Sequence, residues 1–150
     1  MSLVEILDAA ARKVAAIEGI VGASGAGADP AVPAMPLELP GSPYAVGYLN
    51  PGTGTQGFST TVFVDELEFR VYVPKASLPG GYATLLAFPD RFEAAWRTDR
   101  DLGGTCLDSW YAGHGKVDME DWGTSERPLP YLVMSIRIGV RRRVAADFTP

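Results

Sequence analysis

Apolar and polar positions near the start of the chain repeat with the period of an α-helix. Ser2 and Glu5 have the spacing of a capping box, in which each side chain satisfies a free backbone N–H group. The pattern therefore predicts a helix that begins after Ser2 and ends at Gly19. The apolar positions, which fall on one stripe of that helix, are Leu3, Ile6, Leu7, Ala10, Ala11, Val14 and Ile17.

Two later stretches have the period of β-strands. A short strand is expected from Tyr44 to Asn50, and the Asn-Pro-Gly-Thr sequence that begins at Asn50 is typical of a turn. A longer strand is expected from Thr60 to Pro74. In its second half, the apolar residues Leu67, Phe69, Val71 and Val73 alternate with Glu66, Glu68, Arg70 and Tyr72. This alternation predicts one buried face and one polar face.

Helical spacing returns after Pro79-Gly80-Gly81, and a sharp turn is expected at Leu102, Gly103 and Gly104. The residues that define this second helical stretch are Leu85, Phe88, Phe92, Ala95 and Trp96. Pro89 is compatible with a helix only near a first turn.

The last part of the chain predicts three strands. The first runs from Thr105 to Tyr111 and is expected to turn at Gly113 and Gly115, so that Lys116 to Trp122 returns as its partner. The last strand runs from Pro130 to Val144. One face of it carries Leu132, Met134, Ile136, Ile138 and Val140, and the other carries Ser135, Arg137, Arg141 and Arg143.

The elements follow one another as helix, two strands, helix and three strands. This order predicts a single α+β domain over residues 1–150, with a mostly antiparallel sheet and two helices packed on one face. An extended Gly/Ala/Pro-rich arm is expected at about residues 20–43, where Asp29 and Glu38 are the only charges. Its composition excludes a regular helix or a central strand. It is either an arm that lies on a neighbouring protein or a solvated loop.

Composition and charge exclude or disfavour several classes of function. Eighteen acidic and 13 basic residues give a net charge of −5, which disfavours sequence-independent binding of nucleic acid. One cysteine and one histidine exclude an intrachain disulfide and a site built from several thiolates or imidazoles. The N-terminus has no basic leader and the apolar runs are too short for a bilayer, so we expect a cytoplasmic protein that makes no membrane contact.

Candidate catalytic chemistry is sparse. Cys106 and His114 are the only conceivable thiol–imidazole pair, and a strand position favours a small buried Cys106 instead. The acidic group Asp118, Glu120 and Asp121 lacks the spacing of a calcium loop and is interpreted as a solvated turn. We therefore expect no enzyme activity, no metal and no cofactor.

The stretch from Glu66 to Val144 resembles the tail terminator (minor tail or tail-completion) proteins of long-tailed siphophages, particularly those of actinobacterial phages. The resemblance rests on the order of an alternating strand, a helix, the Leu102-Gly103-Gly104 turn and a final strand that contains Tyr131 and Leu132. The alternating strand contributes the pattern of Phe69, Val71 and Val73. In that family an N-terminal helix also precedes the strand, so the resemblance covers about two thirds of the chain. The long, plain arm departs from the family pattern.

The resemblance implies a structural virion protein at the junction of tail and neck, assembled in the cytoplasm of the host bacterium. Such a protein forms a six-fold ring, ends polymerisation of the tail tube and meets a head-side connector, while DNA passes through without specific binding. Its partners would be further copies of itself, the major tail tube protein and the connector or stopper. Another neck component (a stopper or head–tail adaptor) and a small cytoplasmic enzyme or ligand-binding domain stay open as alternatives.

Within this interpretation, charged strand residues are the candidate contacts. Glu66 and Glu68 on one strand and Arg137, Arg141 and Arg143 on another would form opposed charged faces. The candidate partner interface comprises Arg137, Arg141, Arg142 and Arg143. The candidate lining of the bore comprises Glu66, Glu68, Asp118, Glu120 and Asp121.

Overall fold

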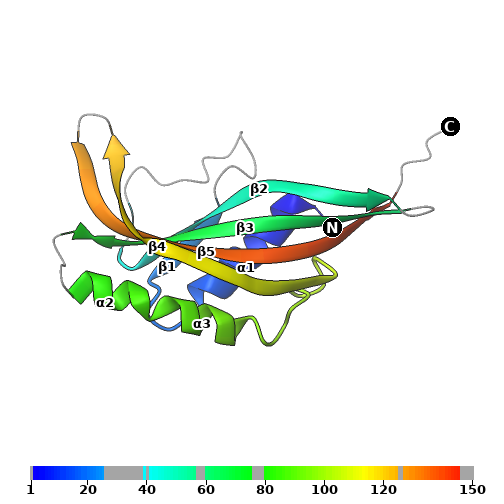
Figure 1. The fold of residues 1–150 in the computed structure, drawn as a ribbon, viewed down its shortest axis with the longest axis horizontal. Helices are drawn as coiled ribbons and strands as arrows, with labels where there is room; N and C mark the ends of the chain where they lie inside the picture. The colour runs from blue at the N-terminus through cyan, green and yellow to red at the C-terminus, as the bar shows by residue number, and fades with distance from the viewer. Residues whose placement is uncertain are drawn as a thin grey trace.

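The computed structural model describes residues 2–25, 39, 41–56, 60–75, 80–124 and 127–145. The chain forms a five-stranded sheet with helices on one side (Figure 1). In chain order, the elements are α1 (Leu3–Ala15), β1 (Gly22–Gly25), β2 (Tyr44–Gln56), β3 (Thr60–Pro74), α2 (Gly80–Leu86), α3 (Phe88–Ala95), β4 (Asp108–Thr124) and β5 (Arg127–Ala145).

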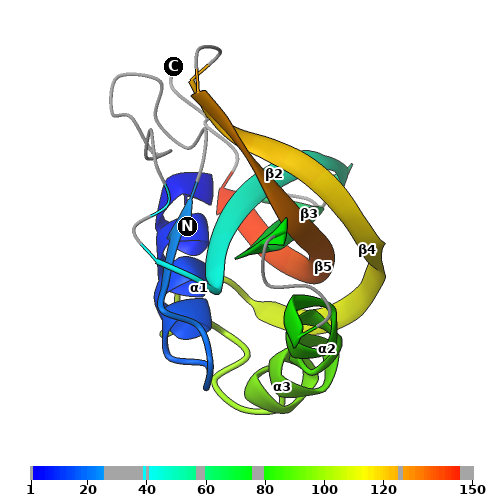
Figure 2. The same ribbon diagram turned by 90° about the vertical axis from the view of Figure 1, so that its left-hand side faces the viewer.

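The strands lie in the order β1-β2-β3-β5-β4. The β1–β2 pair is parallel and the other three pairs are antiparallel, which confirms the α+β class with a mostly antiparallel sheet. The last strand, β5, lies between β3 and β4 rather than at an edge. Seen along its length, the sheet is strongly curved (Figure 2).

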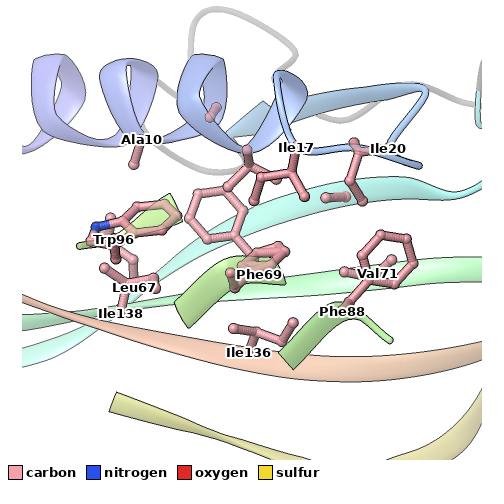
Figure 3. Close-up of a cluster of buried hydrophobic side chains, with 14 of the residues drawn as sticks. Ala10, Ile17, Ile20, Leu67, Phe69, Val71, Phe88, Trp96, Ile136 and Ile138 are labelled. Atoms are coloured by element: carbon pink, nitrogen blue, oxygen red, sulfur yellow. The ribbon is translucent and has the colours of Figure 1, made fainter. Parts of the chain in front are cut away.

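The hydrophobic core lies between the helices and one face of the sheet. The capping box at Ser2 and Glu5 is present, and the apolar stripe of α1 faces the sheet. Figure 3 shows Ala10 and Ile17 of this stripe above Phe69, with Trp96 and Phe88 from the second helical stretch beside it. The predicted alternation is confirmed at Leu67, Phe69, Val71 and Val73, which are all buried against the helices.

Several boundaries differ from the predictions. The strand expected from Thr105 begins only at Asp108, so Cys106 precedes it, and the last strand begins at Arg127 and not at Pro130. The second helical stretch is divided at Ala87 into α2 and α3, and Pro89 lies in the first turn of α3 as a helix tolerates it. β2 continues beyond Asn50 to Gln56, with a bulge between Asn50 and Thr53 in place of the expected turn. The first helix ends at Ala15, a turn before Gly19.

The predicted turn at Gly113 and Gly115 is wrong. β4 is one continuous strand from Asp108 to Thr124, and it pairs with β5 over its whole length. Its register shifts between Tyr111 and Gly113 and again between His114 and Val117. The glycines therefore accompany β-bulges, which bend a strand without reversing it.

The expected arm begins with a strand. Gly22–Gly25 forms β1, which pairs with β2 and lies at the edge of the sheet formed by the described strands. At the other end of the arm, Leu39 packs against side chains on the sheet face that points away from the helices. Residues 26–38 and 40 lie outside the described residues, and so does the choice between a docking arm and a solvated loop.

Candidate functional site

The sheet has a second face, opposite the helices, which we call the outer face. Strand alternation places Glu66, Glu68, Arg70 and Tyr72 of β3 there, as the sequence predicts. Residues directly opposite in an antiparallel pair share a face. The outer face therefore also carries Tyr131, Val133, Ser135 and Arg137 of β5, and Asp118, Glu120 and Trp122 of β4.

An aromatic cluster covers one end of the outer face. Tyr72 is fully buried there, although none of the described helices packs on this side. Its ring makes edge-to-face contacts with Trp122 and Tyr131. The centroid distances are 5.0 Å to Trp122 and 6.0 Å to Tyr131. Tyr44, Val46 and Val133 complete the buried part of this cluster. The outer face thus has a small apolar core of its own.

A polar network surrounds the Tyr72 hydroxyl. This hydroxyl donates to Glu120 Oε2 across 3.2 Å. Arg70 Nη1 donates to Glu120 Oε1 at 3.4 Å, and Arg70 Nε donates to Glu68 Oε2 at 2.8 Å. The Arg70 guanidinium also lies over the ring of Tyr48, 4.7 Å from its centroid. The network joins β2, β3 and β4 across the sheet.

This environment shifts the pKa of both central groups. Burial raises the pKa of Tyr72, and the neighbouring Tyr48 and Glu120 raise it further. Burial alone would lower the pKa of Arg70, but the hydrogen bond and charge of Glu68 and the charge of Glu120 outweigh it and raise this pKa. Tyr72 is therefore a neutral hydrogen-bond donor, and Arg70 stays charged.

The expectation of opposed charged faces is wrong. Glu68 pairs in register with Arg137, so the β3 carboxylates and this arginine share the outer face. Arg137 Nε lies 3.8 Å from Glu66 Oε1, and Asn50 Nδ2 donates to the other oxygen of Glu66 at 3.4 Å. Glu66 and Glu68 therefore neutralise arginines of their own chain.

Arg142 also differs from its predicted placement among the partner-facing arginines. Its side chain points to the helix side of the sheet, where Nε donates to Asp65 Oδ2 at 2.7 Å. It also lies 4.5 Å from the centroid of the Phe63 ring. Both charged side chains are almost excluded from solvent. Arg142 is thus part of an internal ion pair rather than of an exposed patch.

Arg141 and Arg143 are exposed on the outer face, near the end of β5. The Arg141 guanidinium lies 5.8 Å from the centroid of the Trp110 ring, and Val64, directly opposite Arg141 on β3, is 41% exposed. No ion pair is found for Arg141 or Arg143 within the described part of the chain. We call Trp110, Arg141 and Val64 the Trp–Arg patch.

The acidic group expected in a turn lies instead along β4. Asp118 and Glu120 are on the outer face, whereas Asp121, opposite Pro130, is on the other face. Met119 shares that other face with Asp121. It is 62% exposed on the edge strand β4, although its partner in register, Leu132, is buried. The five residues proposed to line a bore are therefore divided between two faces.

The Leu102-Gly103-Gly104 turn has the expected geometry, with φ values of 51°, 68° and 87°. Leu102 is buried in the core, and the backbone N–H of Gly103 donates to Asp99 Oδ1 at 3.2 Å. The turn therefore anchors the loop that leads into β4. Nothing in its geometry suggests a binding site.

Cys106 and His114 form hydrogen bonds with different groups. Cys106 is buried, and its Sγ donates to the backbone carbonyl of Arg100 at 3.7 Å. Burial, together with Asp101 and Asp108, raises the pKa of the Cys106 thiol to about 11. His114 Nδ1 shares a 2.7 Å hydrogen bond with the Tyr111 hydroxyl. This thiol is poorly suited to act as a nucleophile at neutral pH.

Open grooves on the described surface have mixed linings. One of about 460 Å³ lies on the outer face and is lined by Arg70, Lys116, Asp118 and Ser135, among others. Another of about 570 Å³ lies between α1 and α3, beside Lys13. Within the described ranges, no group of three or more His, Cys, Asp or Glu side chains is arranged to hold a metal ion. No described helix has the length and apolar character to cross a bilayer.

Sequence reasoning missed Trp110, Asp65 and the aromatic cluster. Alternation contained a signal for Asp65, because it has the same parity as Leu67 and Phe69 and so points into the core. By the same rule, Arg142 alternates in step with the buried residues Ile138 and Val140, so its side chain is expected on the core-facing side. A charge at a core-facing position implies a partner on the neighbouring strand. No comparable signal marks Trp110, whose surroundings depend on strand register.

Comparisons with known proteins give no further assignment. No protein-family model matches the chain, and no curated protein matches it.

Proposed function

We propose that this protein is a structural virion component that caps the tail tube of a long-tailed phage as a ring of six copies. In this role it ends tube polymerisation and joins the tail to the head-side connector. It acts at the junction of tail and neck, after assembly in the host cytoplasm, and it has no enzymatic activity. Its partners are further copies of itself, the major tail tube protein and the connector or stopper.

The observation that carries the proposal is the outer face of the sheet, which no described helix covers. Among the described residues, the helices pack on one face, and the other presents a buried aromatic cluster, an ionic network and the Trp–Arg patch. Tryptophan and arginine are enriched at protein–protein contacts. The order of turn and strands also supports the proposal, since Leu102-Gly103-Gly104 leads directly into the long β4–β5 hairpin.

Passage of DNA is compatible with the charge. Six copies would carry six times the net charge of −5, and neutralised phosphates are the main source of nonspecific affinity for DNA. Glu66 and Glu68 already offset Arg137 and Arg70, so the outer face contributes little net positive charge. We expect an assembled ring to bind duplex DNA weakly at physiological salt.

The test is a phage that lacks this gene, complemented with the wild-type copy as control. Electron microscopy should show tails of irregular length or tails that fail to join heads, because the tube end stays open to further subunits. A reconstruction of the wild-type virion should place six copies at the neck. Tails of normal length that stay unattached would indicate a stopper or adaptor instead. Normal, joined tails in the deletion phage would reject any role in the neck.

A further inference from the structure

We propose that the Trp–Arg patch binds the end of the β4–β5 hairpin of a second copy of this chain, with Met119 on Trp110 and Asp121 on Arg141. The contact between two copies stands without the proposed function, and only its closure into a ring of six rests on that function. The two surfaces lie toward opposite ends of the sheet: the hairpin projects at one end, and the end of β5 lies at the other (Figure 1). Two different patches on one subunit are what a head-to-tail contact requires.

Within one copy, the Trp110 ring of the Trp–Arg patch is already packed against its own sheet. The indole of Trp110 lies across Gly139, its partner in register on β5. A Cβ at Gly139 would lie 2.5 Å from the indole Nε1, so only glycine leaves room for the ring. Arg141 lies over the same ring from the next outer-face position. A preordered aromatic with a cation beside it loses little conformational freedom on binding.

The hairpin end offers the complementary chemistry. Met119 and Asp121 are two residues apart on the same face of β4, which separates their Cα atoms by about 6.6 Å. Both side chains point to the same side of the strand, as do Trp110 and Arg141, whose guanidinium lies 5.8 Å from the ring centroid. A thioether packs well on an aromatic ring, and a carboxylate pairs with guanidinium. Asp121 has no ion pair among the described residues.

A single copy does not bring the two surfaces together. Asp121 is opposite Pro130, and Arg141 follows Pro130 by eleven positions on β5, which corresponds to about 36 Å of strand. This is several times the distance over which physiological salt screens charges, about 8 Å. The attraction is therefore satisfied between copies.

Sedimentation velocity on the purified chain tests the contact. The wild type should self-associate, more strongly at low salt, and Arg141→Glu or Asp121→Arg alone should weaken association by at least about tenfold. A mixture of these two variants should associate again, because each supplies the charge that the other has lost. Asp118→Arg is the matched control, since Asp118 lies on the opposite face of the same strand and should have little effect.

Met119→Ser provides a second variant that leaves all charges in place and should also weaken association. Thermal unfolding of each variant verifies that it folds. A wild type that stays monomeric at low salt would overturn the contact, and so would association that both charge reversals leave unchanged. An equal effect of Asp118→Arg and Asp121→Arg would overturn the assignment of the face. None of these outcomes alters tail length in the deletion phage, so the proposed function is decided separately.

Discussion

Arg142 donates from Nε to Asp65 Oδ2 across 2.7 Å, and this ion pair is buried at the end of the core on the helix side of the sheet. Side-chain exposure is 13% for Arg142 and 6% for Asp65. The exposed neighbours Arg141 and Arg143 lie on the other face of the same strand. Within three consecutive arginines, one is structural and two are free for intermolecular contacts.

Arg142→Ala should therefore destabilise the fold by about 3 kcal/mol, because it leaves the Asp65 carboxylate buried without a partner. Arg143→Ala is the matched control and should change the free energy of unfolding by less than about 0.5 kcal/mol, as expected for an exposed site. Urea unfolding measures both variants. Similar losses for the two would contradict the assignment of Arg142 to the interior.

Gly139→Ala should destabilise the protein by about 1–3 kcal/mol, since the new methyl group overlaps the Trp110 ring and forces it to move. Gly115→Ala, in the neighbouring strand, is the control, because its new methyl group would lie 4.0 Å from the nearest side-chain atom, Ser135 Cβ. Thermal unfolding compares the two. In a Trp110→Ala background, Gly139→Ala should lower the free energy of unfolding much less than in the wild type. That result would establish that the loss arises from the clash with the ring.

Tyr72→Phe should reduce the free energy of unfolding by about 1–2 kcal/mol, because the hydroxyl that donates to Glu120 is lost inside a buried cluster. Tyr82→Phe removes the same atom from a side chain that is 47% exposed and should have almost no effect. Chemical denaturation of both proteins provides the comparison. Equal stability of the two variants would show that the outer-face network contributes little.

The Cys106 thiol should resist alkylation in the folded protein. Its pKa is raised from 9.0 to about 11, so at pH 8 its thiolate fraction lies about a hundredfold below that of the unfolded chain. Because the folded pKa is the higher one, this group's contribution to stability is complete below pH 9 and is lost as the pH rises toward 11. Iodoacetamide labelling with and without urea measures the difference.

Cys106→Ser is expected to fold and assemble normally, with a packing loss of about 1 kcal/mol. Loss of assembly in Cys106→Ala, in a protein that folds normally, would show that assembly needs the thiol itself and would contradict a purely structural role. Fast labelling of the folded wild type at pH 8 would contradict its burial directly.

Periodicity alone was sufficient for much of the secondary structure. The capping box and apolar stripe predict α1, alternation predicts β3 from Thr60 to Pro74, and both are confirmed together with the Leu102-Gly103-Gly104 turn. These features depend on residues close in sequence, whose geometry is set by the local backbone. The α+β class follows from their order. The turn expected at Gly113 and Gly115 was wrong because glycine accommodates a bulge as readily as a reversal.

The arrangement of the candidate site was decided by the tertiary structure. Alternation within each strand correctly assigned Glu68 and Arg137 to polar faces, but only the β3–β5 register places them opposite each other on the same side of the sheet. Register also puts Trp110 over Gly139 and places the exposed Met119 opposite the buried Leu132. Pairing between strands distant in sequence depends on how the whole core packs, which no local pattern encodes. Alternation along the chain shows which residues of each strand are polar, whereas the packed sheet decides which of them come into contact.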